Sequence, residues 1–227
     1  MANSSGIWQA MVLLTLVVLG TVGSADMTTW QPTGADDWFS IGSWDLRGPT
    51  SSDTAVVGNG GTAQVGAGAA EALALEIGAA LESTRSGTVT VSGGSLAAPT
   101  VRVGTATSNT EDAVARGTGT LDMFDTLFLA STLLEVGVSS TSNSNGAEAF
   151  STGQATLSGG TATVGDLRVG NATTSPGYAV ASGDLLFEDV AFTGTGTWTV
   201  GVANKGSYGR SATVDRASVV IEGDDTS

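Results

Sequence analysis

The side chains of this chain best suited to chemistry are carboxylates, because the sequence contains neither cysteine nor histidine. A β-helix glycosidase or polysaccharide lyase could use four of them as acid and base: Asp122, Asp125, Glu188 and Asp189. Such reactions need carboxylates held together beside a basic group or a bound cation. The outward positions of the expected strands are mainly Thr, Ser and Ala, and two of the seven arginines, Arg102 and Arg168, belong to another pattern. A carbohydrate-active enzyme is therefore the alternative prediction, and we expect no catalytic residue, metal or other cofactor.

That other pattern is a set of charges that recur at one position of a repeated phrase, with alternating sign. The position is occupied in turn by Glu76, Arg102, Glu135 and Arg168. In a strand, the residue between two buried neighbours points to the opposite face. If the phrases stack as parallel strands about 4.8 Å apart, each charge lies beside one of opposite sign. We interpret the four residues as a structural ion column that sets strand register, at about 0.2–1 kcal/mol per exposed pair.

The phrase that positions these charges reads apolar, polar, apolar, glycine, and it occurs five times. Its glycines recur after 26, 33, 33 and 31 residues, at Gly78, Gly104, Gly137, Gly170 and Gly201. Periods of this length are typical of solenoids. The sequence therefore predicts an all-β, single-stranded parallel β-solenoid (β-helix) of about five layers with three strands each. One interior wall should contain the apolar phrase residues, namely Leu75, Ile77, Val101, Val103, Leu134, Val136, Leu167, Val169, Trp198 and Val200.

Strands can be placed within the layers, with glycines at the corners, where positive φ is needed. The second layer is predicted to contain strands 88–92, 95–98 and 100–103, and the third 120–124, 126–130 and 133–136. Residues 69–81 are interpreted as a strand because Leu73, Leu75 and Ile77 alternate with other residues.

The two ends of the chain differ in character from the repeats. The apolar run 10–23, followed by Ser24 and Ala25, predicts a signal peptide at 1–25. Residues 26–52 contain three of the five tryptophans, Trp30, Trp38 and Trp44, which favours a Trp-rich N-terminal cap over a glycan-binding platform. The solenoid repeats then occupy 53–222, and residues 223–227 form an acidic tail.

Several of these segments resemble a known group of proteins. Trp38-x5-Trp44-Asp45, Gly48-Pro49, Asp53 to Val57 and Asn59-Gly60-Gly61 resemble the N-terminal part of secreted bacterial β-solenoid proteins. The Gly-rich repeats, such as 91–96 and 157–161, resemble the same group, which includes autotransporter-associated and PEP-CTERM-type repeat proteins. The resemblance implies a secreted or cell-surface location. It also implies a structural role.

Polar loops leave successive layers at the same point, and aligned loops on one side of a solenoid commonly bind partners. Tyr178 and Tyr208 fall in equivalent loops about one layer apart, and we select them as candidate partner-binding residues. The alternative is that both tyrosines merely cover a column of small residues in the return segment of each layer.

Composition limits the partners further. The net charge is -14 with a single lysine, which disfavours nucleic acid and anionic membrane surfaces. We do not expect an integral membrane protein after cleavage of the signal segment, because the apolar run is short for a span. The prediction is a secreted or cell-surface structural and adhesive module without catalysis, with a surface polysaccharide or an envelope or matrix protein as partner and possible end-to-end self-association. Ice binding through Thr-x-Thr pairs is a further alternative, although the pairs fall at different offsets from the phrase glycine.

Overall fold

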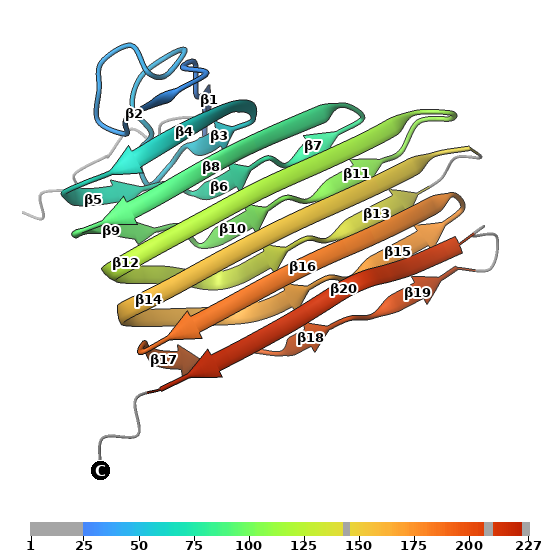
Figure 1. Cartoon of the computed structure of the whole chain (residues 1–227). Coiled ribbons are helices and arrows are strands. Elements are labelled where there is room, and N and C mark those ends of the chain that lie inside the picture. Colours follow the sequence, from blue (N-terminus) through green and yellow to red (C-terminus); the bar gives the residue numbers. More distant parts are fainter. Residues whose placement is uncertain (1–24, 143–145, 207–210, 224–227) are drawn as a thin grey trace, which may run out of the picture.

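The computed structural model describes residues 25–142, 146–206 and 211–223, and within these ranges the chain forms strands joined by turns and loops. Every paired strand runs parallel to its neighbour, and each turn of the chain lies beside the next (Figure 1). This is the parallel β-solenoid that the repeated phrase predicts. The predicted signal segment, apart from Ala25, lies outside the described residues. Within the described part of the chain, no helix is long and apolar enough to cross a membrane.

The repeated phrases form one wall of the solenoid, here called the phrase wall. Its register follows the sequence repeat, since Arg102 pairs with Glu76 on one side and with Glu135 on the other. Its strands are β1 (Met27–Thr29), β3 (Thr54–Val57), β6 (Ala74–Ile77), β10 (Thr100–Val103), the last parts of β12 (Val114–Val136) and β14 (Glu148–Val169), and β18 (Trp198–Val200).

Three further sets of strands complete each turn. The longest set forms a broad sheet and comprises β2 (Ala35–Asp37), β4 (Asn59–Val65), β8 (Thr84–Ser92), the first parts of β12 and β14, β16 (Tyr178–Glu188) and β20 (Ser211–Glu222). A narrow wall comprises β5 (Gly68–Glu71), β9 (Gly94–Ala97), the middle of β12 and β14, and β17 (Ala191–Gly194). Return strands form a separate sheet: β7 (Ala80–Leu81), β11 (Ala106–Ser108), β13 (Ser139–Ser142), β15 (Ala172–Ser175) and β19 (Ala203–Lys205).

The third layer is more continuous than the sequence predicts. Instead of three separate strands, β12 runs unbroken around the corner at Asp125, whose φ is 50°. Its neighbour β14 turns at the same level through Gly159, with φ 69°. Because both strands bend together, their pairing continues past the corner and shifts register only between Ala130 and Leu133.

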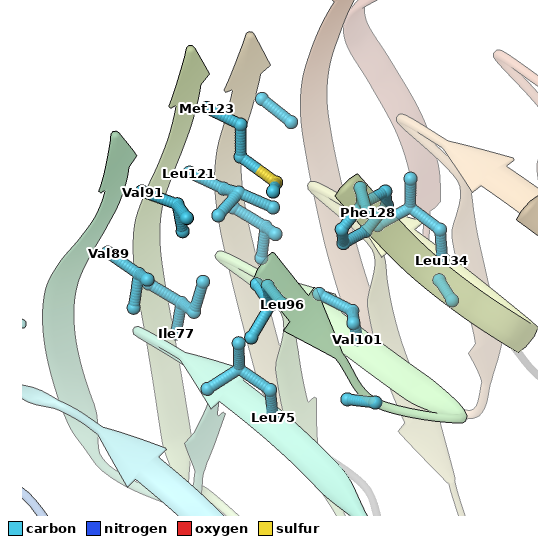
Figure 2. Close-up of a cluster of buried hydrophobic side chains, with 14 of the residues drawn as sticks. Leu75, Ile77, Val89, Val91, Leu96, Val101, Leu121, Met123, Phe128 and Leu134 are labelled. Carbon is cyan, nitrogen blue, oxygen red and sulfur yellow. The ribbon is translucent and has the colours of Figure 1, made fainter. Parts of the chain in front are cut away.

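The main core fills the space between the phrase wall, the narrow wall and the second half of the long strands. Figure 2 shows Leu75 and Val101 of the phrase wall facing Leu121 and Met123 of the broad sheet, with Phe128 of the narrow wall beside them. All five side chains are almost completely buried. Apolar residues stacked on apolar residues of the next layer, such as Leu75 on Val101 and Val91 on Met123, therefore supply most of the apolar burial.

Two expectations about this wall are wrong in part. Eight of the ten predicted phrase residues are fully buried, but Trp198 is 37% exposed and Val200 41% exposed, because no described strand pairs with β18 on the side away from β14. Residues 69–81 do not form one strand either. They divide among β5, β6 and β7, and Leu73 lies between β5 and β6 with its side chain 42% exposed.

Glycines narrow the solenoid where the phrase ends. The long strands carry an in-register column of Gly87, Gly119, Gly153 and Gly183. These face the phrase glycines Gly78, Gly104, Gly137 and Gly170, which all adopt positive φ near 60°. A Cβ on Gly119 would lie 2.3 Å from the backbone N of Gly104 and 2.3 Å from the carbonyl O of Ile77. We call these two facing columns the glycine waist, because only glycine allows the backbones to approach so closely.

Beyond the waist lies a second, thinner compartment lined by small side chains. Alanines of the return strands, such as Ala80 and Ala106, pack against Ala115 and Ala149 of the long strands. A similar cluster follows in the later turns. The return column of small residues noted in the sequence therefore forms a two-layer extension of the solenoid that is too thin to hold larger side chains.

The N-terminal end of the solenoid is closed by the predicted cap. Trp30, Trp38 and Trp44 are 0%, 1% and 3% exposed, and their rings meet edge to face with centroids 5.1 Å and 4.8 Å apart. The indole N–H of Trp44 donates to the carbonyl O of Trp38 at 2.9 Å. This aromatic cluster covers the first layer of the core, as expected of a terminal repeat.

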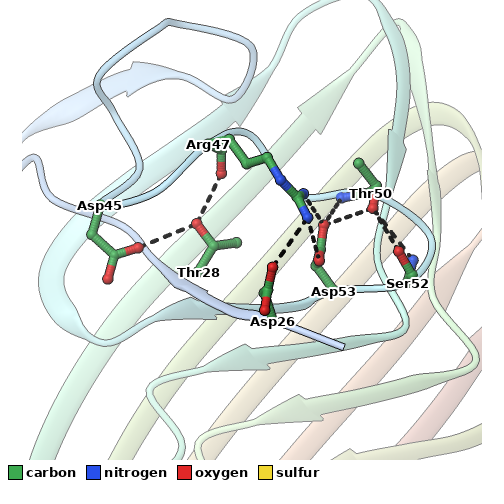
Figure 3. Close-up of polar contacts among 7 residues, drawn as sticks. All are labelled: Asp26, Thr28, Asp45, Arg47, Thr50, Ser52 and Asp53. Carbon is green, nitrogen blue, oxygen red and sulfur yellow. Dashed lines mark hydrogen bonds and ion pairs between the residues drawn. The ribbon is translucent and has the colours of Figure 1, made fainter. Parts of the chain in front are cut away.

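A charged clasp fixes the cap to the first full strand (Figure 3). Arg47 lies 2.5 Å from Asp53 through Nη1 and 3.4 Å from Asp26 through Nη2. The backbone N–H and hydroxyl of Thr50 also donate to Asp53, at 2.9 Å and 2.6 Å. Asp53 is fully buried, and the Arg47 guanidinium holds its pKa well below the usual range. The clasp therefore depends on Asp53 being ionised.

We expect acid to weaken the cap through Asp53. Because its pKa is lower in the folded protein than in the unfolded chain, its contribution is present above an unfolded pKa of about 3.9 and is lost as the pH falls below it. Asp53→Asn should reduce stability at pH 7 and flatten the dependence of stability on pH below pH 4. Urea unfolding followed by tryptophan fluorescence, at pH 7 and at a pH below 4, measures these changes in stability. Asp125→Asn, at an exposed corner, is the control. An equal acid dependence in Asp53→Asn and wild type would refute the assignment.

Candidate functional site: the charge column and the broad face

The four alternating charges lie in one column on the outer side of the phrase wall. Arg102 reaches Glu76 through Nη1 and Glu135 through Nε, both at 3.1 Å, and Arg168 reaches the second oxygen of Glu135 at 3.1 Å. The Glu135 side chain is only 10% exposed, whereas those of Arg102 and Arg168 are 37% and 49% exposed. The Glu135 carboxylate is thus paired with arginines from both neighbouring layers, which indicates a structural role.

A shallow groove of about 430 Å³ runs beside this column, where the phrase wall meets the return strands. Arg102, Arg85, Thr107 and Leu81 are among its lining residues. Because Arg102 is already engaged by two carboxylates, the groove offers a ligand little unpaired charge from the column itself. We therefore assign the column to register and not to binding.

Reversal of the central charge tests the energetic value of the column. Arg102→Glu removes two favourable contacts and places three carboxylates in sequence, so it should lower the free energy of unfolding by about 1 kcal/mol or slightly more. Chemical denaturation at low ionic strength measures the change. In 1 M salt the difference should shrink, because exposed charges are screened over about 3 Å. A stability unaffected by the reversal would leave the column without energetic weight.

The four carboxylates considered for catalysis do not converge. Asp125 and Asp189 occupy the same corner two layers apart, with φ of 50° and 52°, where the layer between them has Gly159. Aspartate tolerates this left-handed conformation, so both residues have a structural explanation. Glu188 is exposed and accepts a hydrogen bond from Ser158. No cluster of three potential metal ligands occurs in the described residues.

Asp122 is the remaining member of that set, and its environment differs. It is half-buried on the broad sheet, and this burial raises the pKa of its carboxyl above the usual value. A second carboxylate of this sheet, Asp184, forms an ion pair: its Oδ1 lies 2.8 Å from Nε of Arg216. From the strand pairing, Asp122 and Asp184 are two strands and two residues apart, or roughly 12 Å between Cα atoms.

The outward side of β8, β12, β14, β16 and β20, here called the broad face, carries an aromatic and cationic stack. The guanidinium of Arg116 lies 4.2 Å from the ring centroid of Phe150, whose ring is 5.7 Å from that of Tyr178. Arg116 is exposed, and both rings are partly exposed. Tyr178 begins strand β16 and does not lie in a loop as predicted, because β14 extends the sheet to Glu148, its partner residue. Tyr208 lies outside the described residues.

The same face is hollowed near its centre and C-terminal end. A shallow groove of about 460 Å³ lies over β14, β16 and β20, lined among others by Gln154, Thr156, Asp184, Arg216 and Ser218. Its amide, hydroxyl, carboxylate and guanidinium groups offer both donors and acceptors.

The Thr-x-Thr pairs do not form one array. Thr88 and Thr90 lie on β8 of the broad face, whereas Thr161 and Thr163 lie on the narrow wall. The described structure thus separates pairs that an extended ice-binding surface would need on one wall.

Arg116, Phe150, Asp184 and Arg216 were not selected from the sequence. They are spread over four strands, and only the register brings them together, since Arg116 pairs with Phe150 and Asp184 with Ser218. A column alignment of the long strands could have revealed them.

Comparison with known protein families, with curated proteins and with solved structures finds no match to this chain.

Proposed function

We propose that this protein is a secreted or cell-surface structural module that binds a surface polysaccharide through its broad face and carries out no catalysis. The observation that carries the proposal is the stack of Arg116, Phe150 and Tyr178 on a flat, rigid sheet. Secretion is supported by the apolar run 10–23 followed by Ser24 and Ala25.

The rigidity of the face supports a binding role. Backbone hydrogen bonds fix each long strand to its neighbours, and the side chains stand outward in columns. Tyrosine supplies a large contact area at a low cost in conformational entropy, and its hydroxyl can also hydrogen-bond. A sugar ring could lie on the exposed aromatic edge while the hydroxyls of other sugars in the same chain meet the polar groove.

A polymer suits the shape of the face better than a small molecule. The aromatic stack lies at the start of the long strands, and the polar groove lies towards their middle and end. Both positions are on the same outward surface, so an extended chain of sugars could contact the two together. The groove is shallow, whereas sites for small molecules are usually enclosed clefts.

A carbohydrate-active enzyme is the second candidate, favoured by one observation. Asp122 has a raised pKa, as a general acid requires, and it lies on the same face. Against this, the second carboxylate on this face, Asp184, is already engaged by Arg216 at 2.8 Å, which favours binding over hydrolysis.

A glycan array with purified protein tests the proposal. We expect binding to a polysaccharide that weakens at least about tenfold in Tyr178→Ala and in Phe150→Ala, equivalent to about 1.4 kcal/mol. Leu127→Ala, on the narrow wall and 53% exposed, should bind like wild type. Equal loss in all three variants, or no binding to any glycan, would contradict the assignment of the face. Turnover of a polysaccharide that Asp122→Asn abolishes would favour the enzyme.

A further inference from the structure

Glu148 lies beside the aromatic stack of the broad face. It begins β14, and its register partner on the adjacent strand β16 is Tyr178 (Figure 1). Register partners on neighbouring parallel strands lie about 4.8 Å apart, and both side chains are partly exposed on the same side of the sheet. Within the described residues the Glu148 carboxylate makes neither a hydrogen bond nor an ion pair, whereas Asp184 of the same face is held by Arg216 and Ser218. An aromatic ring therefore stands beside a carboxylate that is not neutralised.

The aromatic stack already holds one cation, on its other ring. The guanidinium of Arg116 lies 4.2 Å from the ring centroid of Phe150, and no other cation of the described residues lies over either ring. Arg116 is on β12, two strands from Tyr178, whereas Glu148 is on the strand next to it. An aromatic ring attracts a cation that comes within about 6 Å of its centroid. The Tyr178 ring can therefore accept a second cation from a ligand, at a point where Glu148 supplies a full negative charge.

From this juxtaposition we infer that the polysaccharide bound by the broad face carries free amino groups, and that an ammonium group of the ligand lies between the Tyr178 ring and the Glu148 carboxylate. The inference rests on the proposed function and adds the chemical class of the sugar. A ring face and a carboxylate both stabilise an ammonium ion, the first through its quadrupole and the second through a charge-assisted hydrogen bond. An N-acetylated sugar presents a neutral amide instead, which leaves Glu148 without a counter-charge.

The charge of the surrounding strands favours the same class of ligand. The long strands of the broad face, at 84–92, 114–124, 148–158, 178–188 and 211–222, carry three arginines and six carboxylates, a net charge of -3 (3 − 6). These residues are Arg85, Arg116 and Arg216 against Asp122, Glu148, Asp184, Glu188, Asp215 and Glu222. The whole chain has a net charge of -14, so its field attracts a cationic polymer and repels an acidic or sulfated one.

Two hexasaccharides of β-1,4-linked glucosamine test the inference, one fully N-acetylated and one fully deacetylated, because they differ only at the amino groups. Calorimetric titration of the full chain at low ionic strength and about pH 5.5, where a glutamate of ordinary pKa is ionised, measures both affinities. We expect the deacetylated hexasaccharide to bind at least about tenfold more tightly. In 1 M salt the ratio of the two affinities should fall, because exposed charges are screened over about 3 Å. A ratio near one, or binding of neither hexasaccharide, would overturn the inference.

A pair of charge-matched variants locates the preference. Glu148→Gln should reduce the ratio of the two affinities about fivefold, the effect of one exposed ion pair. Glu71→Gln removes the same charge from β5 on the narrow wall, where Glu71 is exposed, and should keep the wild-type ratio. Equal ratios in the two variants would refute the role of Glu148.

The glycan array tests the proposed function separately. Binding confined to neutral glycans would keep the broad face as a glycan site and refute the preference for amino groups. No binding to any glycan would refute both.

Discussion

Replacing Gly119 by alanine is expected to lower the free energy of unfolding by about 3 kcal/mol or more. The added Cβ would lie 2.3 Å from the backbone N of Gly104 and 2.3 Å from the carbonyl O of Ile77. Both of these are backbone atoms in paired strands, so neither can rotate away as a flexible side chain could. Relief of the clash requires the phrase wall and the broad sheet to separate, which disturbs the core on one side of the waist and the alanine compartment on the other.

Gly66→Ala is the matched control, because a Cβ at Gly66 meets no atom within 4 Å and its φ is not positive. It should be nearly neutral, since the same methyl group is added without a clash. Urea unfolding of the two variants beside wild type measures the difference. Equal stabilities for Gly119→Ala and Gly66→Ala would mean that the waist is wider in solution than in the structure.

Only one of the two glycine columns of the waist was predicted from the sequence. The phrase glycines were predicted at corners, and their positive φ confirms this. The second glycine column of the long strands was missed, because a glycine inside a strand carries no obvious turn signal. Its spacing follows the repeat, from Gly87 to Gly119, Gly153 and Gly183, so it could have been found by aligning the long strands.

Stacking order was predictable because the phrase combines periodicity with alternating charge. Arg102 lies between Glu76 and Glu135 as that alternation requires. The partial exposure of the apolar residues in the fifth phrase was not predictable from the phrase itself. Trp198 occupies the same position in its phrase as Leu167, but burial in a solenoid also depends on the next layer, and the described residues provide none beyond β18.

The broad face was harder to predict for a related reason. Tyr178 was selected as a loop residue, and its importance in the structure comes from Phe150 and Arg116, which lie 28 and 62 residues earlier in the chain (178 − 150 and 178 − 116). Cross-strand neighbours in a solenoid are about one repeat apart, and a repeat that varies between 26 and 33 residues hides the alignment. Only the exact register of the long strands reveals which outward side chains meet.

Replacing Val136 by aspartate should unfold the central layers of the solenoid. Val136 is fully buried in the main core, between Val103 and Val169 of the adjoining layers. These neighbours offer no counter-charge. An unpaired buried carboxylate costs several kcal/mol, about 3–5 by analogy with broken buried ion pairs, which is a large part of the 5–15 kcal/mol that stabilises a typical domain. We expect loss of the β-sheet circular dichroism signal or a steep fall in melting temperature.

Leu127→Asp controls for the introduction of a charge, because Leu127 lies on the narrow wall with 53% of its surface exposed. That variant should melt close to wild type, since its carboxylate remains hydrated. The comparison separates burial from net charge, because both variants add one negative charge to the same repeat. If Val136→Asp melted like Leu127→Asp, the phrase residues would not face the interior. Because each turn contacts mainly its neighbours, a defect at Val136 in the third layer should interrupt the stack on both sides.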